Sequence, residues 1–174
     1  KAIQNKNNRR KIFCSSIEHK CVLESFEFCK KYGFDVEHIP VNKLGQVDIE
    51  WLEKKTDDKT FLISVMAVNN ETGIRTNLEE INKICKQKGI LFHSDMAQAL
   101  LGQKYNLSEL DIDAISISGH KIYGPKGVGA LICNEPPSKL ILPITDGGLQ
   151  EQDVRSGTMP VFLAVGLSSA LEII

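Results

Sequence analysis

The chain has 174 residues, enough for one domain with a hydrophobic core and too few for two domains of ordinary size. Its 21 Lys and Arg residues nearly balance its 22 Asp and Glu residues, so no strong positive field is available to attract nucleic acid or anionic lipid. No apolar run approaches the roughly 20 residues that a membrane span requires, and we expect neither nucleic-acid binding nor membrane insertion.

The polar start, KAIQNKNNRRK, lacks the apolar centre of a secretory signal and is expected to be an exposed loop. The cysteines are odd in number, widely spaced and without a C-x-x-C pair, which favours neither a disulfide framework nor a zinc site. We expect free thiols in a reducing compartment, and no bound metal. The cysteines are Cys14, Cys21, Cys29, Cys85 and Cys133.

In the first third of the chain, residues 11–16 predict a short strand, and residues 20–31 have apolar side chains at helical spacing. Gly33 is a plausible end for that helix. Residues 34–41 are predicted to be extended, and Asp48 is placed to cap a short helix that follows.

The clearest buried strand is predicted at residues 60–68, TFLISVMAV. Nearly continuous apolar sequence of this length is typical of a parallel strand that is covered on both faces. Residues 77–88 then predict a helix, with Thr76 or Asn77 as its cap and Gly89 as its end.

Two further short strands are predicted at residues 90–93 and 114–118, and residues 129–132 are predicted to run back from the intervening glycine turn. This alternation predicts an α/β fold, with helices on the faces of a mostly parallel sheet. Residues 145–158 have the composition of a functional or flexible loop, and residues 161–174 predict an apolar helix. In such folds the ligand crevice lies beyond the carboxyl ends of the strands.

Polar side chains of three kinds follow three of the predicted strands. Asp95 follows ILFHS, Asn70 comes after SVMAV, and Lys121 comes after AISIS. Singly, Asp95 serves as a helix cap, Asn70 holds a turn and Lys121 is a solvated loop lysine. If the strands are neighbours, the three together suit pyridoxal phosphate, because an amine forms a Schiff base with its aldehyde and a carboxylate pairs with its pyridinium nitrogen.

Five segments extend this pattern along the chain: EHKCVLES, VNNETG, HSDMAQ, SGHKIYGPKG and RSGTMP. In order and spacing they resemble the cysteine desulfurases of the NifS and IscS type, group I of that family, from Lys11 to Ile174. The resemblance implies the three-layer αβα large domain of fold-type I, class V aminotransferases. It also implies a pyridoxal-phosphate enzyme that converts L-cysteine to L-alanine and passes on sulfur as a persulfide, for iron-sulfur cluster assembly and tRNA thiolation.

The resemblance assigns roles to individual residues of this sequence. Lys121 matches the lysine that binds the cofactor as a Schiff base and shuttles protons at the substrate Cα. Asp95 matches the partner of the pyridine nitrogen, and His19 matches a histidine that stacks on the ring and acts as acid or base. Gln98 and Asn70 match neighbours of the phenolic oxygen, and Asn70 also matches a contact to the substrate carboxylate.

Further implied roles concern the cofactor phosphate and the partners. Ser118 and His120 match phosphate contacts, and Thr158 matches a threonine that reaches the phosphate in a partner subunit, which implies a homodimer. His38 and His93 are expected to be structural. The implied sulfur acceptor is an iron-sulfur scaffold protein or another protein. The implied compartment is the bacterial cytoplasm, or a mitochondrion or related organelle.

Some features depart from the family pattern. Residues 1–174 correspond to a central part of the large domain, without the upstream phosphate-gripping segment or the small domain with the nucleophilic cysteine loop, so the isolated chain is expected to be inactive. Met96 stands where a small residue is usual, which predicts crowding near the ring. Two alternatives stay open: a selenocysteine lyase or SufS-like class V enzyme, and a non-catalytic fragment that keeps the cofactor scaffold.

Overall fold

The computed structural model describes residues 8–143 and 145–174, so the start of the chain, expected to be an exposed loop, falls largely outside the described residues. Its centre is a six-stranded sheet in the order β2-β1-β3-β4-β5-β6. The first five strands pair in parallel, and β6 runs antiparallel to β5, as predicted. The strands are β1 (Lys11–Ser15), β2 (Asp35–Ile39), β3 (Thr60–Ser64), β4 (Leu91–Asp95), β5 (Ala114–Ser118) and β6 (Gly129–Cys133).

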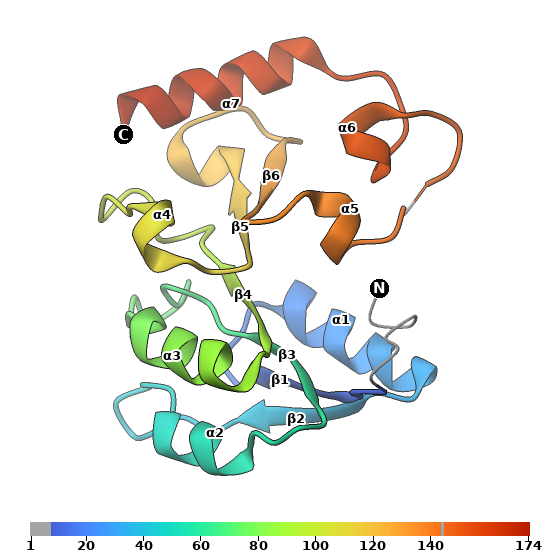
Figure 1. The fold of residues 1–174 in the computed structure, drawn as a ribbon. Coiled ribbons are helices and arrows are strands. Elements are labelled where there is room, and N and C mark those ends of the chain that lie inside the picture. Colours follow the sequence, from blue (N-terminus) through green and yellow to red (C-terminus); the bar gives the residue numbers. More distant parts are fainter. Residues whose placement is uncertain (1–7, 144) are drawn as a thin grey trace.

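Helices precede or follow most of these strands, and short helical turns lie in several of the loops (Figure 1). Four of these short elements, η3, α4, α5 and α6, have no counterpart among the predicted elements. The helices of the described residues are α1 (Lys20–Cys29), η2 (Lys30–Tyr32), α2 (Ile49–Lys55), α3 (Leu78–Lys88), α4 (Leu107–Leu110), η3 (Gly119–Ile122), α5 (Pro137–Leu140), α6 (Gln150–Asp153) and α7 (Val161–Ile173).

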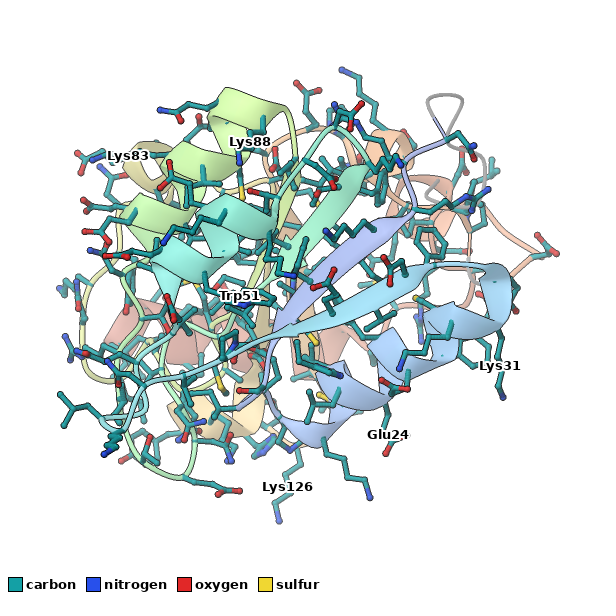
Figure 2. All side chains as sticks on the ribbon, turned by 90° about the horizontal axis from the view of Figure 1, so that it is seen from below. Glu24, Lys31, Trp51, Lys83, Lys88 and Lys126 are labelled. Carbon is teal, nitrogen blue, oxygen red and sulfur yellow. The ribbon has the colours of Figure 1, made fainter. Side chains whose placement is uncertain are left out.

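Helices cover both faces of the sheet, which confirms the predicted α/β architecture in three layers. On one face, Ile12 and Cys14 of β1 belong to a core cluster with Phe26 of α1. On the other face, Phe13 shares a larger cluster with residues of α2, α3 and α7, such as Leu52. Figure 2 shows the sheet between α1 on one side and α2 and α3 on the other.

Local side chains determine where the predicted helices begin and end. The Asp48 side chain accepts the Trp51 N–H at 2.9 Å and caps α2. Asn77, and not Thr76, caps α3, because the Thr76 hydroxyl donates to the Met66 carbonyl. Two of the predicted helix ends hold, since Gly33 and Gly89 both have the left-handed backbone that favours glycine.

The third strand is shorter than the predicted span of residues 60–68. The chain beyond β3 still lies beside β4, where the Ala67 N–H donates to the Asp95 carbonyl at 2.9 Å. On its other side β1 has ended, and the Met66 N–H donates to the Glu18 side chain instead of to a strand. The strand β3 therefore ends at Ser64, because beyond it the backbone is bonded to a side chain on one side and no longer to β1.

The order of the strands creates a switch point between β1 and β3. The connection through α1 leads from β1 to β2 on one side, whereas β3 pairs with β1 on the other side. Ligands of open α/β sheets bind where the strand order reverses, outside the carboxyl ends of the strands. Within the described residues, no helix is both long and apolar enough to cross a bilayer.

Replacing the cap of α2 tests the local account of this helix. Asp48→Ala removes the acceptor of the Trp51 N–H and is expected to lower the free energy of unfolding by about 1 kcal/mol. Urea unfolding of the protein containing this chain measures the change. Asp58→Ala is the control, because Asp58 is exposed and forms no hydrogen bond within the described residues. Equal losses in both variants would contradict the assignment.

Candidate functional site

Four neighbouring parallel strands end at one edge of the sheet. Their order is β1, β3, β4 and β5, so the segments that follow them lie next to one another. His19 follows β1, Asn70 follows β3, Asp95 ends β4 and Lys121 follows β5. The condition on which the predicted site depended, neighbouring strands, is therefore met.

His19 lies at the beginning of α1, where its side chain caps the helix. Its Nδ1 accepts the backbone N–H of Cys21 at 3.2 Å, and the Cys21 thiol lies 2.9 Å from the same nitrogen. Because Nδ1 is an acceptor, the neutral ring carries its proton on Nε2. The ring is exposed, so Nε2 is the nitrogen available to another molecule.

Asp95 is half-buried and uses one oxygen to fix its own turn. Its Oδ1 accepts the Ala97 N–H at 2.9 Å, while its other oxygen accepts no hydrogen bond from the described residues. Gln98 follows in the same turn, also half-buried. Met96 between them is fully buried, and its side chain packs into the main core cluster. The crowding near a ring stays a prediction.

The turn after β5 holds Lys121 on a tightly specified backbone. A Cβ on Gly119 would lie 3.0 Å from the Pro125 carbonyl oxygen, and one on Gly124 would lie 2.9 Å from the Gly119 carbonyl oxygen. The Ser118 hydroxyl lies 3.0 Å from Nδ1 of His120. Lys121 itself is exposed and forms no hydrogen bond or salt bridge with the described residues, so its amine is free to react.

The two asparagines after β3 behave differently. Asn69 is buried, donates to the Ile17 carbonyl at 2.8 Å and accepts the Thr72 N–H, so it holds the loop in place. Asn70, the predicted site residue, is exposed and has no hydrogen-bond partner among the described residues. The amide of Asn70 is therefore available to a ligand, and that of Asn69 is not.

Thr158 is the predicted site residue that does not lie at or just after the end of a parallel strand. It is exposed in the segment between α6 and α7 and makes no hydrogen bond to a strand-end residue. Two apolar hollows, of about 350 and 280 Å³, also lie away from the strand ends, and no predicted site residue lines either one. In the described part of the chain, no three His, Cys, Asp or Glu side chains are grouped to hold a metal ion.

The groups at the strand ends fit pyridoxal phosphate by their chemistry. An unpaired amine at Lys121 matches an aldehyde, and the free oxygen of Asp95 matches a protonated ring nitrogen. Ser118 and His120 supply a hydroxyl and a ring N–H for phosphate oxygens. In the described part of the chain, no predicted site residue at this edge forms a salt bridge that would compete with the cofactor.

Comparison with known proteins decides the family. A model of the family described as aminotransferase class-V matches residues 1–174. The chain belongs to the class-V aminotransferases. It is 46% identical over 168 residues to the "Probable cysteine desulfurase, mitochondrial" of Dictyostelium discoideum, covering 97% of this chain and 37% of that protein. It is 46% identical over 167 residues to the "Cysteine desulfurase IscS" of Rickettsia bellii, covering 96% of this chain and 41% of that protein.

Solved structures of the family share this fold. The chain matches a structure titled "NIFS-LIKE PROTEIN" with a TM-score of 0.90 and 40% identity, over 97% of this chain and 46% of that one. It matches "SspA in complex with cysteine" with a TM-score of 0.89 and 38% identity, over 94% of this chain and 47% of that one. This class-V chain thus spans 37 to 41% of the length of the curated relatives described above.

All five cysteines of this class-V chain are free, as expected, and they lie in strands and helices. Burial raises the pKa of Cys14 to about 12, with smaller contributions from Glu18 and Glu27, and burial likewise raises the pKa of Cys85 to about 12. Such thiols stay protonated at neutral pH and are weak nucleophiles. Burial also raises the pKa of the exposed Cys21 thiol.

Three polar side chains, of which Ser64 is buried and His93 and Ser116 are half-buried, form a hydrogen-bonded ladder beside Asp95. His93 Nδ1 lies 2.8 Å from the Ser64 hydroxyl, and its Nε2 lies 2.6 Å from the Ser116 hydroxyl. Burial lowers the pKa of His93 below its usual 6.5, and the charge of Asp95 opposes this only in part. The ring is therefore neutral at pH 7 and links β3, β4 and β5, in agreement with the expected structural role.

Glu18 and Asn69 are the residues at this edge that sequence reasoning missed. Glu18, in the β1–α1 loop, is 5% exposed and accepts a hydrogen bond from the chain after β3. Asn69, in the loop after β3, donates a hydrogen bond back to the β1–α1 loop. The only available signal was position: each stands next to a predicted site residue, in EHK and in VNNETG.

Acid should weaken the protein partly through His93. A folded-state pKa below the unfolded value means that the unfolded chain binds this proton more readily, so stability from this group is present above about pH 6.5 and lost as the pH falls. His93→Gln is expected to reduce the loss of unfolding free energy between about pH 7.5 and pH 5, measured with urea. The control, exposed His120→Gln, should leave that loss unchanged; an unchanged loss in His93→Gln would contradict the account.

Proposed function

We propose that this chain carries the cofactor-binding part of a pyridoxal-phosphate-dependent cysteine desulfurase. The observation that carries the proposal is the edge where β1, β3, β4 and β5 present an imidazole, an amide, a carboxylate and an unpaired lysine amine. Relatives named cysteine desulfurase, at 46% identity, support the same activity. Because the chain spans well under half of those relatives, the activity belongs to a longer protein.

Each residue at the edge has a distinct task in this proposal. When bound, pyridoxal phosphate supplies an electron sink for negative charge at the substrate Cα. Lys121 anchors the cofactor and moves a proton to and from that carbon, since its amine has no hydrogen-bond or salt-bridge partner among the described residues. Asp95 pairs its free oxygen with the ring nitrogen. Gln98 and Asn70 donate amide N–H groups, Asn70 from an exposed position and Gln98 from a half-buried one.

The remaining residues bind the cofactor phosphate and the substrate. Ser118 and His120, 3.0 Å apart, hold the phosphate together from one turn. The Nε2 of His19 exchanges protons with the substrate thiol, because Nδ1 is occupied by the Cys21 N–H. A structure of a relative bound to cysteine, the SspA complex, supports L-cysteine as the substrate.

The sulfur leaves L-cysteine as a persulfide on a protein thiol, and L-alanine remains. The buried Cys14 and Cys85 are unsuited to this transfer, because their pKa values of about 12 keep them protonated. Burial also raises the pKa values of the other three thiols, Cys21, Cys29 and Cys133, and all five cysteines lie in helices or strands. We therefore assign the transfer to a cysteine outside residues 1–174, in a domain beyond this central part of the large domain. The acceptor of the persulfide is an iron-sulfur scaffold protein or another sulfur acceptor, including one for tRNA thiolation.

A homodimer and a reducing compartment complete the proposal. The helix α7 exposes apolar side chains, among them Phe162 at 76% and Val165 at 58%, which suit burial against another surface. Thr158 lies three residues before this helix and is exposed, so its hydroxyl is available to the phosphate of a partner subunit. Relatives named mitochondrial and mitosomal support an organelle, and the bacterial relatives support a cytoplasm.

The lysine assignment is tested by comparing two exposed lysines of the same turn. Lys121→Ala is expected to abolish both the visible absorbance of the lysine-bound cofactor and the formation of alanine from L-cysteine by the full-length protein. Lys126→Ala is the control, since Figure 2 shows Lys126 pointing away from the body of the molecule. If the absorbance band persists unchanged in Lys121→Ala, the assignment is wrong.

The role of Asp95 predicts a separation of binding from chemistry. Asp95→Asn keeps the acceptor for the Ala97 N–H but cannot hold the ring nitrogen protonated, so turnover should fall by about 100-fold while most of the cofactor stays bound. Alanine production and cofactor content of the full-length protein measure the two effects. Asp58→Asn, on the exposed surface, should change neither. Complete loss of the cofactor with Asp95→Asn would show that the carboxylate acts in binding.

A further inference from the structure

Glu18 is a buried carboxyl group at the switch point between β1 and β3. It follows β1, directly precedes His19 and is 5% exposed. Its Oε1 accepts the Met66 N–H at 2.7 Å, which joins the β1–α1 loop to the chain beyond β3. The Asn69 amide, which donates to the Ile17 carbonyl at 2.8 Å, forms a second link between the same two loops.

The other oxygen of Glu18 is buried without a hydrogen-bond partner in the described residues. No salt bridge among those residues includes Glu18. A buried carboxylate that lacks both a cation and a full set of donors is costly, whereas the neutral acid is tolerated. The geometry therefore favours a proton on the unpartnered oxygen.

The surrounding charges act in the same direction. Burial raises the pKa of Glu18 to about 7, the Met66 N–H and the Ser15 hydroxyl oppose the rise, and the negative charge of Asp95 adds to it. The other titratable groups that interact with Glu18 are the thiols of Cys14 in β1 and Cys21 in α1, whose pKa values are raised mainly by burial and less by Glu18. Among the described residues no cation offsets these acidic neighbours, so Glu18 is largely protonated below neutral pH.

We propose that Glu18 is a positioning residue that, as a neutral acid, holds the loop carrying His19 against the end of β3 without adding a charge beside Asp95. The role rests on the proposed function, because His19 and Asp95 are the residues that it serves. The hydrogen bond to Met66 fixes the start of α1, and hence the imidazole that caps it, relative to the Asn69–Asn70 loop. Proton loss places a second negative charge beside Asp95 and disfavours this packing.

Glu18→Gln is the decisive variant, because its amide oxygen still accepts the Met66 N–H and its side chain is neutral at every pH. Glu18→Ala removes the link itself. The matched controls are Glu24→Gln and Glu24→Ala, on the exposed surface of α1, where Figure 2 shows the side chain pointing outward. All variants are made in the full-length protein.

Thermal unfolding of the cofactor-free protein tests the proton. A folded-state pKa raised from 4.5 to about 7 contributes stability that is fully present below the unfolded value and is lost as the pH rises through the folded value. The unfolding midpoint of Glu18→Gln, relative to that of the parent, should therefore rise by about 3 °C between pH 5.5 and pH 8.5. A difference between the two proteins that does not change with pH would overturn the protonated state.

Titration with pyridoxal phosphate at about pH 7 tests positioning. Glu18→Gln should bind like the parent, whereas Glu18→Ala should bind about 10-fold more weakly and should also have a higher KM for L-cysteine. Equal binding and KM in all three proteins would overturn the positioning role. If the parent binds no pyridoxal phosphate, the proposed function and the positioning role both fail, while the unfolding result still decides whether Glu18 carries the proton.

Discussion

Parallel pairing between β1 and β3 is the contact on which the arrangement of the strand ends depends. The register joins Lys11 to Thr60 and Cys14 to Ser64, so both strands stop at the same level of the sheet. The chain leaves β1 toward β2 on one side, whereas β3 lies on the other side, and in open α/β sheets such a reversal is where ligands bind between the following loops. Glu18 and Asn69 link these two loops, and the residue after each, His19 and Asn70, is exposed.

Uncharged hydrogen bonds lie on the same face of the sheet as Asp95, one of whose oxygens accepts no hydrogen bond from the described residues. The register places Asp95 opposite Ser116, and Ser64 opposite His93, so these side chains share a face of the sheet. The neutral imidazole between two hydroxyls contributes dipoles without a competing charge. A carboxylate in such surroundings interacts strongly with any cation that reaches it, because few other ions screen the pair.

Much of the fold could be predicted from residues that strongly prefer one kind of local structure. Asp48 and Asn77 mark helix starts, Gly33 and Gly89 mark ends, and the apolar TFLIS run is a covered strand. The end of β3 was beyond such reasoning, since it depends on a glutamate far away in the chain. The strand-end residues were found by motif, but the burial of Met96 and Glu18 depends on three-dimensional packing that no local pattern encodes.

The central position of β1 has a consequence for synthesis of the chain. β1 is made first among these strands, yet its two neighbours, β2 and β3, are made after it, and β3 is the later one. On the ribosome, one edge of β1 therefore has no partner strand until residues 60–64 have followed. The strand-end loops can meet only after that non-local contact has formed, so assembly of the candidate site waits for the slower, long-range part of folding.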